Sequence, residues 1–341
     1  MARLVVVSFR LGSFDGVSIE AQKWTDTFRS LGHEVITLAG DGDADIVMSE
    51  LAIRASNVPD IYKVSQVLNG ADLVVVENMV SLPLNVAARD VLYRVLDQRA
   101  ALFHHHDLAW QRPEWIDEPA PLDRPNWRHV TINDLSKREL CDRGLIASTI
   151  RNAFNPDPPL GRRDVTRHAL GISDERLVLL PTRAIPRKNI PGAIRLAEEL
   201  DAVLWLLGPS EDGYEPHLES LLADARIVVR RRLGEGFDVH DAYAASDLVV
   251  MPSTWEGFGN PVLESVTHRR PLAVFPYPVL EEIRSFGFRF FGLDDVQEIG
   301  AFLDQPDDGL LEQNLAIARQ HFNIADLPAR LAPLLETWGL N

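Results

Sequence analysis

The sequence predicts an α/β protein made of two units, each built around a parallel sheet. Short apolar runs rich in β-branched residues alternate with amphipathic segments, which is typical of parallel strands joined by helices. The chain has 341 residues, of which 46% are hydrophobic and 25% are charged. This length and composition suit two globular cores rather than a disordered chain.

Ten apolar runs are predicted to be strands, because each is short and bounded by polar residues or glycine. Five lie in the first half of the chain, at residues 4–9, 35–39, 72–77, 101–106 and 129–133. The other five lie at residues 177–182, 203–208, 226–230, 247–252 and 272–276. Nearly continuous apolar runs of this kind indicate strands that are buried on both faces, as in parallel sheets.

Three segments between the strands carry helix signals. Residues 18–31 have large apolar side chains at helical spacing. Ser136 and Glu139 have the spacing of a capping box and predict the start of a second helix. Asn189 and Pro191 predict the start of a third helix, with the asparagine as its cap and the proline in its first turn.

One segment separates the two sets of strands. Residues 151–163 contain three prolines, and proline interrupts both helices and sheets because it lacks a backbone N–H. This segment is therefore the best candidate for a linker. We expect a first unit of residues 1–158 and a second unit that begins at residue 159.

Composition excludes several classes of protein. The net charge is −16, which disfavours partners rich in phosphate such as nucleic acid or an anionic membrane surface. Cys141 is the only cysteine, so an intrachain disulfide and a cysteine-based zinc site are impossible. The sequence has no run of 18 apolar residues, and its start suits a strand better than a signal peptide. We expect a soluble, cytoplasmic protein.

The segment 247–270 is the most informative one for function. Its predicted strand is followed by a turn and a helix start that comprise Glu256, Gly257, Phe258, Gly259 and Asn260. Two glycines before a helix allow backbone N–H groups to approach an anion such as phosphate. Glu256 and Glu264 are carboxylates that could accept hydrogen bonds from a sugar diol. The alternative interpretation is an ordinary strand, turn and helix with solvated acids.

A second segment, 181–191, is basic. Arg183, Arg187 and Lys188 follow a predicted strand, so we expect them at the carboxyl edge of the second sheet, where open α/β sheets bind ligands. An arginine fork and a mobile lysine charge both suit phosphate oxygens. The alternative is a solvated basic turn.

Three consecutive histidines end the predicted strand at 101–106. His104 and His106 should share one face of that strand, with His105 on the other. A metal site, a contact from one histidine to a substrate hydroxyl, and a structural histidine all remain open. A metal site would need a further ligand that the sequence does not identify.

The loop at residues 8–21 contains Gly12 and Gly16 and leads into a predicted helix. It lacks the spacing of a dinucleotide-binding loop and the Gly-Lys-Ser/Thr of a Walker motif. On its own it is better interpreted as an ordinary connection between strand and helix.

Taken together, these segments resemble the GT-B retaining glycosyltransferases of family 4. Glu256 and Glu264, with Gly-Phe-Gly between them, resemble the family's Glu-x7-Glu element. Arg183 and Lys188 resemble its diphosphate-binding pair, and His106 in "ALFHHHDL" resembles the histidine that reaches the donor sugar. The segments "GVSIEAQKWTDTFRSLGHEV" and "VTINDLSKREL" also resemble its first domain.

The resemblance implies two Rossmann-like domains that face each other across a cleft. It implies an acceptor-side domain at residues 1–158, a nucleotide-sugar-binding domain at 159–322, and a C-terminal helix within 323–341 that crosses back to the first domain. A hexose would pass with retention from a donor of the UDP-glucose or GDP-mannose type to a hydroxyl of a small-molecule or glycan acceptor, without a metal or other cofactor.

The same resemblance implies a role for each matching residue. Arg183 and Lys188 would neutralise the diphosphate, Glu256 and His106 would hold the donor sugar, and Glu264 would bind the ribose. The remaining expected donor contacts come from Gly16, Arg187, Gly257, Phe258, Gly259 and Asn260. The family's usual mechanism needs no protein base.

Some features leave alternatives. Asp15 stands where many members of the family have glycine, and one hypothesis is that its carboxylate faces the acceptor. Another nucleotide-sugar enzyme of the same fold, such as an epimerase, is a second possibility. A non-catalytic nucleotide-sugar or glycan-binding module is a third.

Overall fold

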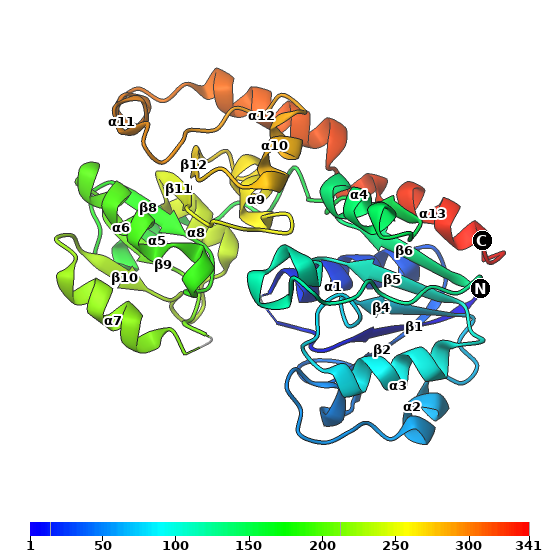
Figure 1. Ribbon diagram of the computed structural model, residues 1–341. Helices are drawn as coiled ribbons and strands as arrows, with labels where there is room; N and C mark the ends of the chain where they lie inside the picture. Colours follow the sequence, from blue (N-terminus) through cyan, green and yellow to red (C-terminus); the bar gives the residue numbers. More distant parts are fainter. Residues whose placement is uncertain (14, 212, 341) are drawn as a thin grey trace. The chain divides into compact units, whose positions relative to one another are not determined.

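A computed structural model of the chain describes residues 1–13, 15–211 and 213–340. These residues form two compact units (Figure 1), one of Met1–Asn152 with Ala325–Asn341 and the other of Ala153–Ile324. The expected limits at residues 158 and 322 differ from the observed ones by a few residues. The first unit is therefore built from both ends of the chain.

Seven parallel strands form the sheet of the first unit, in the order β3-β2-β1-β4-β5-β6-β7. They are β1 (Arg3–Ser8), β2 (Glu34–Ala39), β3 (Ile46–Val47), β4 (Leu73–Glu77), β5 (Ala101–His105), β6 (Trp127–Thr131) and β7 (Ala147–Thr149). The five strands predicted for this half of the chain are confirmed, with ends that shift by at most two residues. The two unpredicted strands, β3 and β7, are the short strands at the edges.

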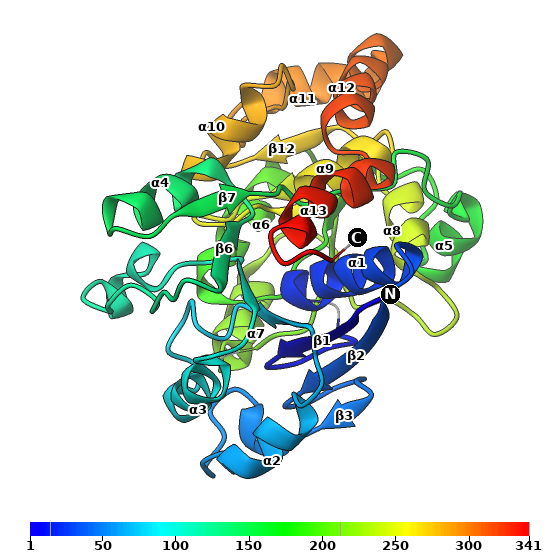
Figure 2. The same ribbon diagram turned by 90° about the vertical axis from the view of Figure 1, so that its right-hand side faces the viewer.

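Helices cover both faces of this sheet. They are α1 (Gly16–Ser30), α2 (Ile61–Val67), α3 (Val86–Leu96), α4 (Asp134–Asp142) and α13 (Leu327–Glu336), with single 3-10 turns at Ser49–Leu51, Ala109–Gln111 and Pro113–Trp115. Successive strand residues point to opposite faces, so Val5 and Val7 pack with α2 and α3. Leu4 and Val6 pack on the other face with α1 and α13, which lie side by side in Figure 2.

Helix α13 completes the core of the first unit although it is encoded at the end of the chain. Leu327, Leu331 and Leu335 recur every four residues and are at most 2% exposed. They share a cluster with Trp24 and Phe28 of α1. Helix α13 thus covers one face of the first sheet together with α1.

Five parallel strands form the sheet of the second unit, in the order β10-β9-β8-β11-β12. They are β8 (Leu177–Leu180), β9 (Val203–Leu206), β10 (Val229–Arg231), β11 (Leu248–Met251) and β12 (Leu272–Val274). All five predicted strands are confirmed, with ends within three residues of the expected ones. Because the strands are parallel, their carboxyl ends lie at one edge of the sheet.

The second unit contains eight α-helices among its described residues. They are α5 (Arg163–Ala169), α6 (Ile190–Glu199), α7 (Glu215–Asp224), α8 (Val239–Ala245), α9 (Asn260–Thr267), α10 (Pro278–Arg284), α11 (Val296–Asp304) and α12 (Asp308–His321). Single 3-10 turns lie at Pro186–Lys188 and, where the chain passes back to the first unit, Ile324–Asp326. Helices α6, α7 and α11 share one apolar cluster with β8, β9 and β11.

Two predicted helix starts have different outcomes. Asn189 caps α6 as predicted: it lies in the left-handed region at φ 47°, and its side-chain oxygen accepts from the Gly192 N–H at 3.3 Å. The predicted capping box at Ser136 is wrong. Asn133 caps α4 instead, because its side-chain oxygen accepts from the Ser136 N–H at 2.7 Å.

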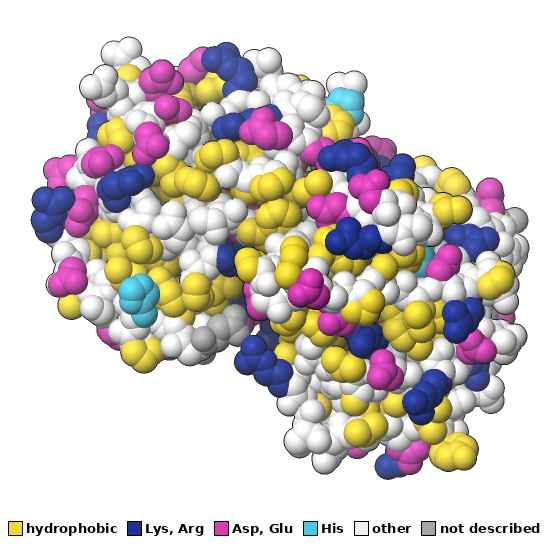
Figure 3. Space-filling view, viewed as in Figure 1, with side chains coloured by type: hydrophobic (Ala, Val, Ile, Leu, Met, Phe, Trp, Pro, Cys, Tyr) yellow, Lys and Arg dark blue, Asp and Glu magenta, His cyan; other side chains and the backbone are white. Residues whose placement is uncertain are grey.

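None of the helices within the described residues is both long and apolar enough to cross a membrane. On the face shown in Figure 3, basic side chains are interspersed with acidic ones and do not gather into a single basic patch.

Candidate functional site

Two loops at the carboxyl edge of the second sheet are tied to each other. One follows β8 and contains the 3-10 turn Pro186–Lys188, and the other joins β11 to α9. The Thr254 N–H donates to the Arg187 carbonyl at 2.9 Å. The Arg187 guanidinium donates to the Trp255 carbonyl, also at 2.9 Å. The basic segment and the segment with Glu256 therefore form one structure.

These loops bring Arg187, Lys188 and Glu256 into contact. The Lys188 ammonium donates to Glu256 Oε1, and the Arg187 guanidinium donates to Glu256 Oε2 at 2.9 Å. Lys188 is 6% exposed and Glu256 is 7% exposed. Buried charges are tolerated only when they are paired, because each loses its hydration. The result is a preformed charged cluster at the sheet edge.

Burial and neighbouring charges oppose each other in this cluster. Burial raises the pKa of Glu256, but Lys188 and Arg187 outweigh it and lower that pKa to about 2. Burial lowers the pKa of Lys188 to about 8, because the charge of Glu256 offsets it only in part. At neutral pH the pair is charged on both sides. The charge of Lys188 is lost in the mildly alkaline range.

Arg183 lies at the same edge with a different partner. Its guanidinium donates to Glu211 Oε2 at 2.6 Å. The backbone nearby is fixed, because the Ala184 N–H donates to the Pro209 carbonyl at 2.8 Å. The Arg183 side chain is 30% exposed, and exposed ion pairs are weak. Arg183 can therefore exchange its carboxylate for an incoming anion at little cost.

The turn before α9 depends on Gly259. Its φ of 90° lies in the left-handed region, and a Cβ there would lie 2.4 Å from the Tyr277 hydroxyl oxygen. Glycine thus lets the chain enter α9 at Asn260 without a side chain between the backbone and the sheet edge. Gly257 and Asn260 flank this turn at the N-terminal end of the helix, where a helix dipole favours an anion.

The side chain of Phe258 does not face the sheet edge. Its side chain is 3% exposed and packs with Phe154 and Phe322, whose rings both lie 6.1 Å from it. Its carbonyl accepts from the Tyr277 hydroxyl at 2.8 Å. The ring is therefore part of the core. Any contact of Phe258 with a donor would come from its backbone N–H.

Glu264 lies in the second turn of α9, and a side chain of α8 fixes its carboxylate. The hydroxyl of Tyr243, which is fully buried in α8, donates to Glu264 Oε2 at 2.7 Å. The Tyr243 ring also stacks on His268, with centroids 4.4 Å apart. Burial raises the pKa of Tyr243, and the charge of Glu264 raises it further. Tyr243 thus stays a hydrogen-bond donor that fixes the carboxylate.

Several buried polar atoms near this edge lack a hydrogen-bond partner within the described parts of the chain, and two of them flank the charged cluster. These two are the Thr182 hydroxyl, just after β8, and the indole N–H of Trp255, beside Glu256. Buried polar groups are normally hydrogen-bonded, so an unsatisfied pair needs an explanation. A polar ligand at the carboxyl edge would supply it.

In the first unit, the ends of β4 and β5 bring Glu77, His104 and His106 together. The strand register places Glu77 beside His104. Glu77 Oε2 lies 2.9 Å from His104 Nδ1 and 2.8 Å from His106 Nε2. As predicted, His105 points to the opposite face, where it contacts the Ser81 hydroxyl at 2.7 Å.

The three histidines differ in the exposure of their rings and in the hydrogen bonds that their ring nitrogens make. His105 uses both nitrogens, one on Ser81 and one on His129. His104 Nε2 also has no hydrogen-bond partner among the described residues, but His104 is only 1% exposed and its ring stacks on Trp24 at 3.9 Å. His106 keeps 5% of its surface exposed, and its Nδ1 makes no hydrogen bond with any residue that the structure describes. Of the three, His106 is the one placed to meet a ligand.

Gly16 is the first residue of α1, and a Cβ there would meet nothing within 4 Å. The adjacent Asp15 is the N-cap of this helix. Its carboxylate accepts from the Val17 and Ser18 N–H groups at 3.1 Å and pairs with Arg10. The Asp15 carboxylate therefore already has a structural role as a helix cap, which is an alternative to the hypothesis that it faces an acceptor.

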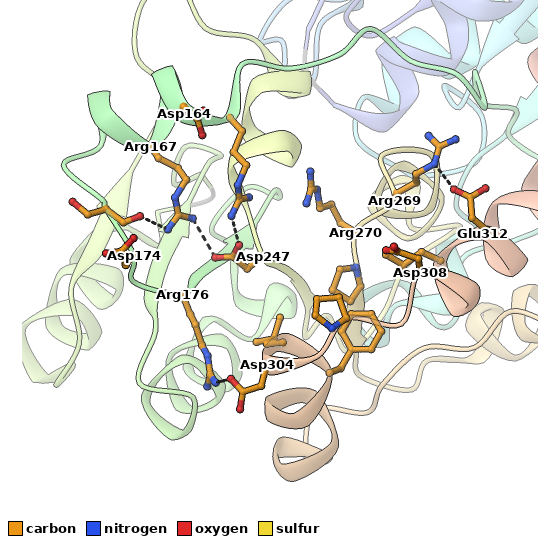
Figure 4. Close-up of a pocket in the computed structure, with 17 residues that line it drawn as sticks. Asp164, Arg167, Asp174, Arg176, Asp247, Arg269, Arg270, Asp304, Asp308 and Glu312 are labelled. Carbon is orange, nitrogen blue, oxygen red and sulfur yellow. Dashed lines mark hydrogen bonds and ion pairs between the residues drawn. The ribbon is translucent and has the colours of Figure 1, made fainter.

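A large open pocket of about 1110 Å³ lies at the other, amino edge of the second sheet. Figure 4 shows that several of its charged side chains pair with one another, among them Arg167 with Asp247, Arg176 with Asp304, and Arg269 with Glu312. None of the predicted site residues lines it. Ligands of open α/β sheets bind at the carboxyl edge, so this pocket is not the candidate site.

The structure thus groups the predicted residues within each unit. In the second unit, Arg187, Lys188 and Glu256 are in direct contact, whereas Arg183 and Glu264 have partners of their own. Sequence reasoning missed Glu77, Tyr243, Thr182 and Trp255. For Glu77 a signal existed, because a carboxylate that ends an apolar strand beside a histidine-rich strand is placed at a ligand-binding edge.

Residues 162–291 match the family model described as glycosyl transferases group 1. This range contains Arg183, Arg187, Lys188, Glu256 and Glu264.

Two curated relatives and one solved structure are similar over most of the chain. The mannosylglucosylglycerate synthase of Thermotoga maritima is 26% identical over 95% of this chain and 97% of its own length. The protein of the same name from Petrotoga mobilis is 26% identical over 86% and 87%. The structure of Anabaena HepE in complex with UDP and glucose has a TM-score of 0.75 at 15% identity, covering 99% of this chain and 100% of that one.

Proposed function

Because the chain belongs to the group 1 glycosyltransferases and has their GT-B fold, we propose that it transfers a hexose with retention from a nucleotide-diphosphate sugar to an acceptor hydroxyl. The buried cluster of Arg187, Lys188 and Glu256 carries this proposal. It joins two cations suited to a diphosphate with a carboxylate suited to a sugar hydroxyl.

In the proposed reaction, the bond between the anomeric carbon and the diphosphate oxygen breaks. The acceptor oxygen forms the new bond to the same face of that carbon, and its proton passes to the leaving diphosphate. Negative charge therefore develops on the diphosphate. Lys188, Arg187 and Arg183 stabilise it, together with the backbone N–H groups at the start of α9.

These fixed charges support the proposal of a reaction without a metal, because paired cations can stabilise the charge on the diphosphate that a metal ion would otherwise stabilise. Glu264 binds the ribose hydroxyls and is oriented for this by Tyr243. Glu256 and His106 bind the donor sugar, and the acceptor contacts the first unit.

Two donors are favoured. The names of the two curated relatives describe a product that contains mannose, glucose and glycerate, which favours a mannose donor and a small acceptor. HepE was solved with UDP and glucose, which favours UDP-glucose. We therefore test GDP-mannose and UDP-glucose first.

Thermal unfolding with added nucleotides tests the proposal. A ligand that binds only the folded protein stabilises it by about 2.7 kcal/mol at 100 times its Kd. We expect either UDP or GDP, and its sugar conjugate, to raise the melting temperature in the presence of EDTA. The shift should disappear in Lys188→Ala. If no nucleotide shifts the wild-type protein, a glycan-binding module becomes the better description.

Replacing Tyr243 by phenylalanine tests whether its hydroxyl orients Glu264 for donor binding. Tyr243→Phe removes one donor from a charged carboxylate, and a hydrogen bond to a charged group is worth about 1.5–3 kcal/mol. We expect the KM for the donor to rise about tenfold to a hundredfold, with kcat nearly unchanged. Tyr62→Phe is the matched control, because Tyr62 is 80% exposed. Equal donor KM values in the two variants would remove Tyr243 from the donor site.

A further inference from the structure

Glu77 is a buried carboxylate whose described partners are both histidines. It is fully buried, its Oε2 contacts His104 and His106, and its Oε1 has no hydrogen-bond partner inside the described residues. A buried carboxylate needs a counter-charge or donors, because it has lost its hydration. No lysine or arginine within residues 1–13, 15–211 and 213–340 pairs with Glu77, so the two imidazoles must supply both the counter-charge and the donors.

The residue after Glu77 holds the backbone of the same strand end. Asn78 adopts a left-handed conformation, with φ 59°. Its N–H donates to the His104 carbonyl at 2.9 Å. Its side-chain oxygen accepts from the His106 N–H at 2.9 Å and from the Asp107 N–H at 3.3 Å. Glu77 and Asn78 thus fix His106 through its ring and its backbone respectively.

This arrangement decides which nitrogen of His106 is available. Nε2 is occupied by Glu77, at 2.8 Å. Nδ1 is therefore the atom left to meet a ligand. A ring that is protonated beside Glu77 carries a proton on Nδ1 as well, which makes Nδ1 a charged donor.

We propose that Glu77 is a positioning residue for sugar transfer: it holds His106 so that the Nδ1–H of the imidazolium points to a hydroxyl of the donor hexose. This inference rests on the proposed function. It adds to that function a residue outside the matched segment 162–291. This residue affects binding of the donor sugar but not binding of the diphosphate.

The other charged groups around His106 already have partners. Glu20 of α1 pairs with Lys23 at 2.6 Å, and Asp107 pairs with Arg112 at 3.0 Å. His104 faces the same carboxylate as His106. Burial lowers the pKa of His106, but the hydrogen bond and charge of Glu77 outweigh it and raise that pKa. Burial lowers the pKa of His104 with less compensation.

The same three side chains could instead hold a divalent cation, because their ligand atoms all lie within 4.8 Å of one another. Two contacts favour the hydrogen-bonded arrangement. The oxygen-to-nitrogen distances of 2.9 and 2.8 Å are those of charge-assisted hydrogen bonds. Ligands of a tetrahedral zinc ion at about 2.0–2.1 Å would lie roughly 3.3 Å apart.

A double-mutant cycle tests the proposal, using Glu77→Gln, His106→Ala and the double variant. We expect Glu77→Gln to lower kcat about tenfold to a hundredfold, by analogy with groups that orient ligand-binding histidines. Affinity for the nucleoside diphosphate alone should not change. The double variant should be no slower than His106→Ala, since Glu77 acts through that ring. Ser81→Ala is the control, because it removes the matching contact of His105 on the opposite face.

A second measurement does not depend on activity. Nitrogen NMR of labelled histidine, with the His106 signal assigned from His106→Ala, should show a protonated ring near neutral pH in the wild type. That ring should be neutral in Glu77→Gln. A neutral His106 in the wild type would overturn the proposal even if no transfer activity is found, so its failure is distinct from failure of the proposed function.

Two further results would also overturn it. One is a wild-type protein that transfers sugar and a double variant whose loss of kcat equals the product of the losses in Glu77→Gln and His106→Ala. The other is stoichiometric zinc in the purified protein that is lost in Glu77→Gln, which would make the cluster a metal site.

Discussion

Lys188→Met lowers kcat/KM for sugar transfer about 10²–10³-fold. This is the cost of removing one preorganised group that stabilises charge developing in a transition state. Methionine keeps the unbranched apolar stem and lacks only the terminal ammonium, and Glu256 keeps Arg187 as a partner at 2.9 Å. The loss should therefore reflect the missing charge and not a collapsed loop. Steady-state kinetics with the donor identified by thermal unfolding measures it.

Lys63→Met is the matched control, because Lys63 is an exposed lysine in the first unit. It should transfer sugar at the wild-type rate. The melting temperature of Lys188→Met shows whether the variant is folded. A folded Lys188→Met protein with wild-type kcat/KM would exclude Lys188 from the diphosphate site.

Transfer by the wild-type protein also falls as the pH rises above about 8. The pKa of Lys188 in the free protein is about 8, because burial lowers it and Glu256 restores it only in part. The pH dependence of kcat/KM reports groups of the free enzyme. We expect a plateau below pH 8 and a fall of about tenfold per pH unit above it, while Glu256 stays ionised throughout.

Lys188→Arg separates this titration from other effects, since a guanidinium stays charged at these pH values. Its pH profile should remain flat where that of the wild type falls. Unfolding does not account for the fall. A lysine whose pKa is lowered on folding makes stability rise with pH between the folded value and 10.5. Identical profiles for the two proteins would assign the titration to another group.

Most of the fold can be predicted from the sequence because its strands are buried on both faces. Runs such as residues 4–9 and 247–252 are apolar throughout, and they became β1 and β11. The edge strands β3 and β7 have two and three residues, too few to show a pattern. The start of α4 is hard to predict, because Asn133 and Ser136 both have side chains that can cap a helix.

The site was predictable only in part. Spacing along one loop places Arg187 and Lys188 side by side, but it cannot show that both contact Glu256, 68 residues away. Phe258 lies between two glycines that favour a ligand loop, and its ring nonetheless turns into the core. The partnership of Glu77 with His106 depends on the register of β4 and β5, which sequence does not reveal.

Because α13 packs on the first sheet, the unit that is synthesised first is the last to be completed. The second unit is one continuous segment and can complete its core once residue 324 has emerged. The first unit emerges earlier but lacks Leu327, Leu331 and Leu335 over its α1 face. At about 5–20 residues per second, roughly 10–40 s of translation separate Asn152 from Leu335. During that time Trp24 and Phe28 lack part of their apolar cover, so the nascent first unit exposes an apolar face until α13 has emerged.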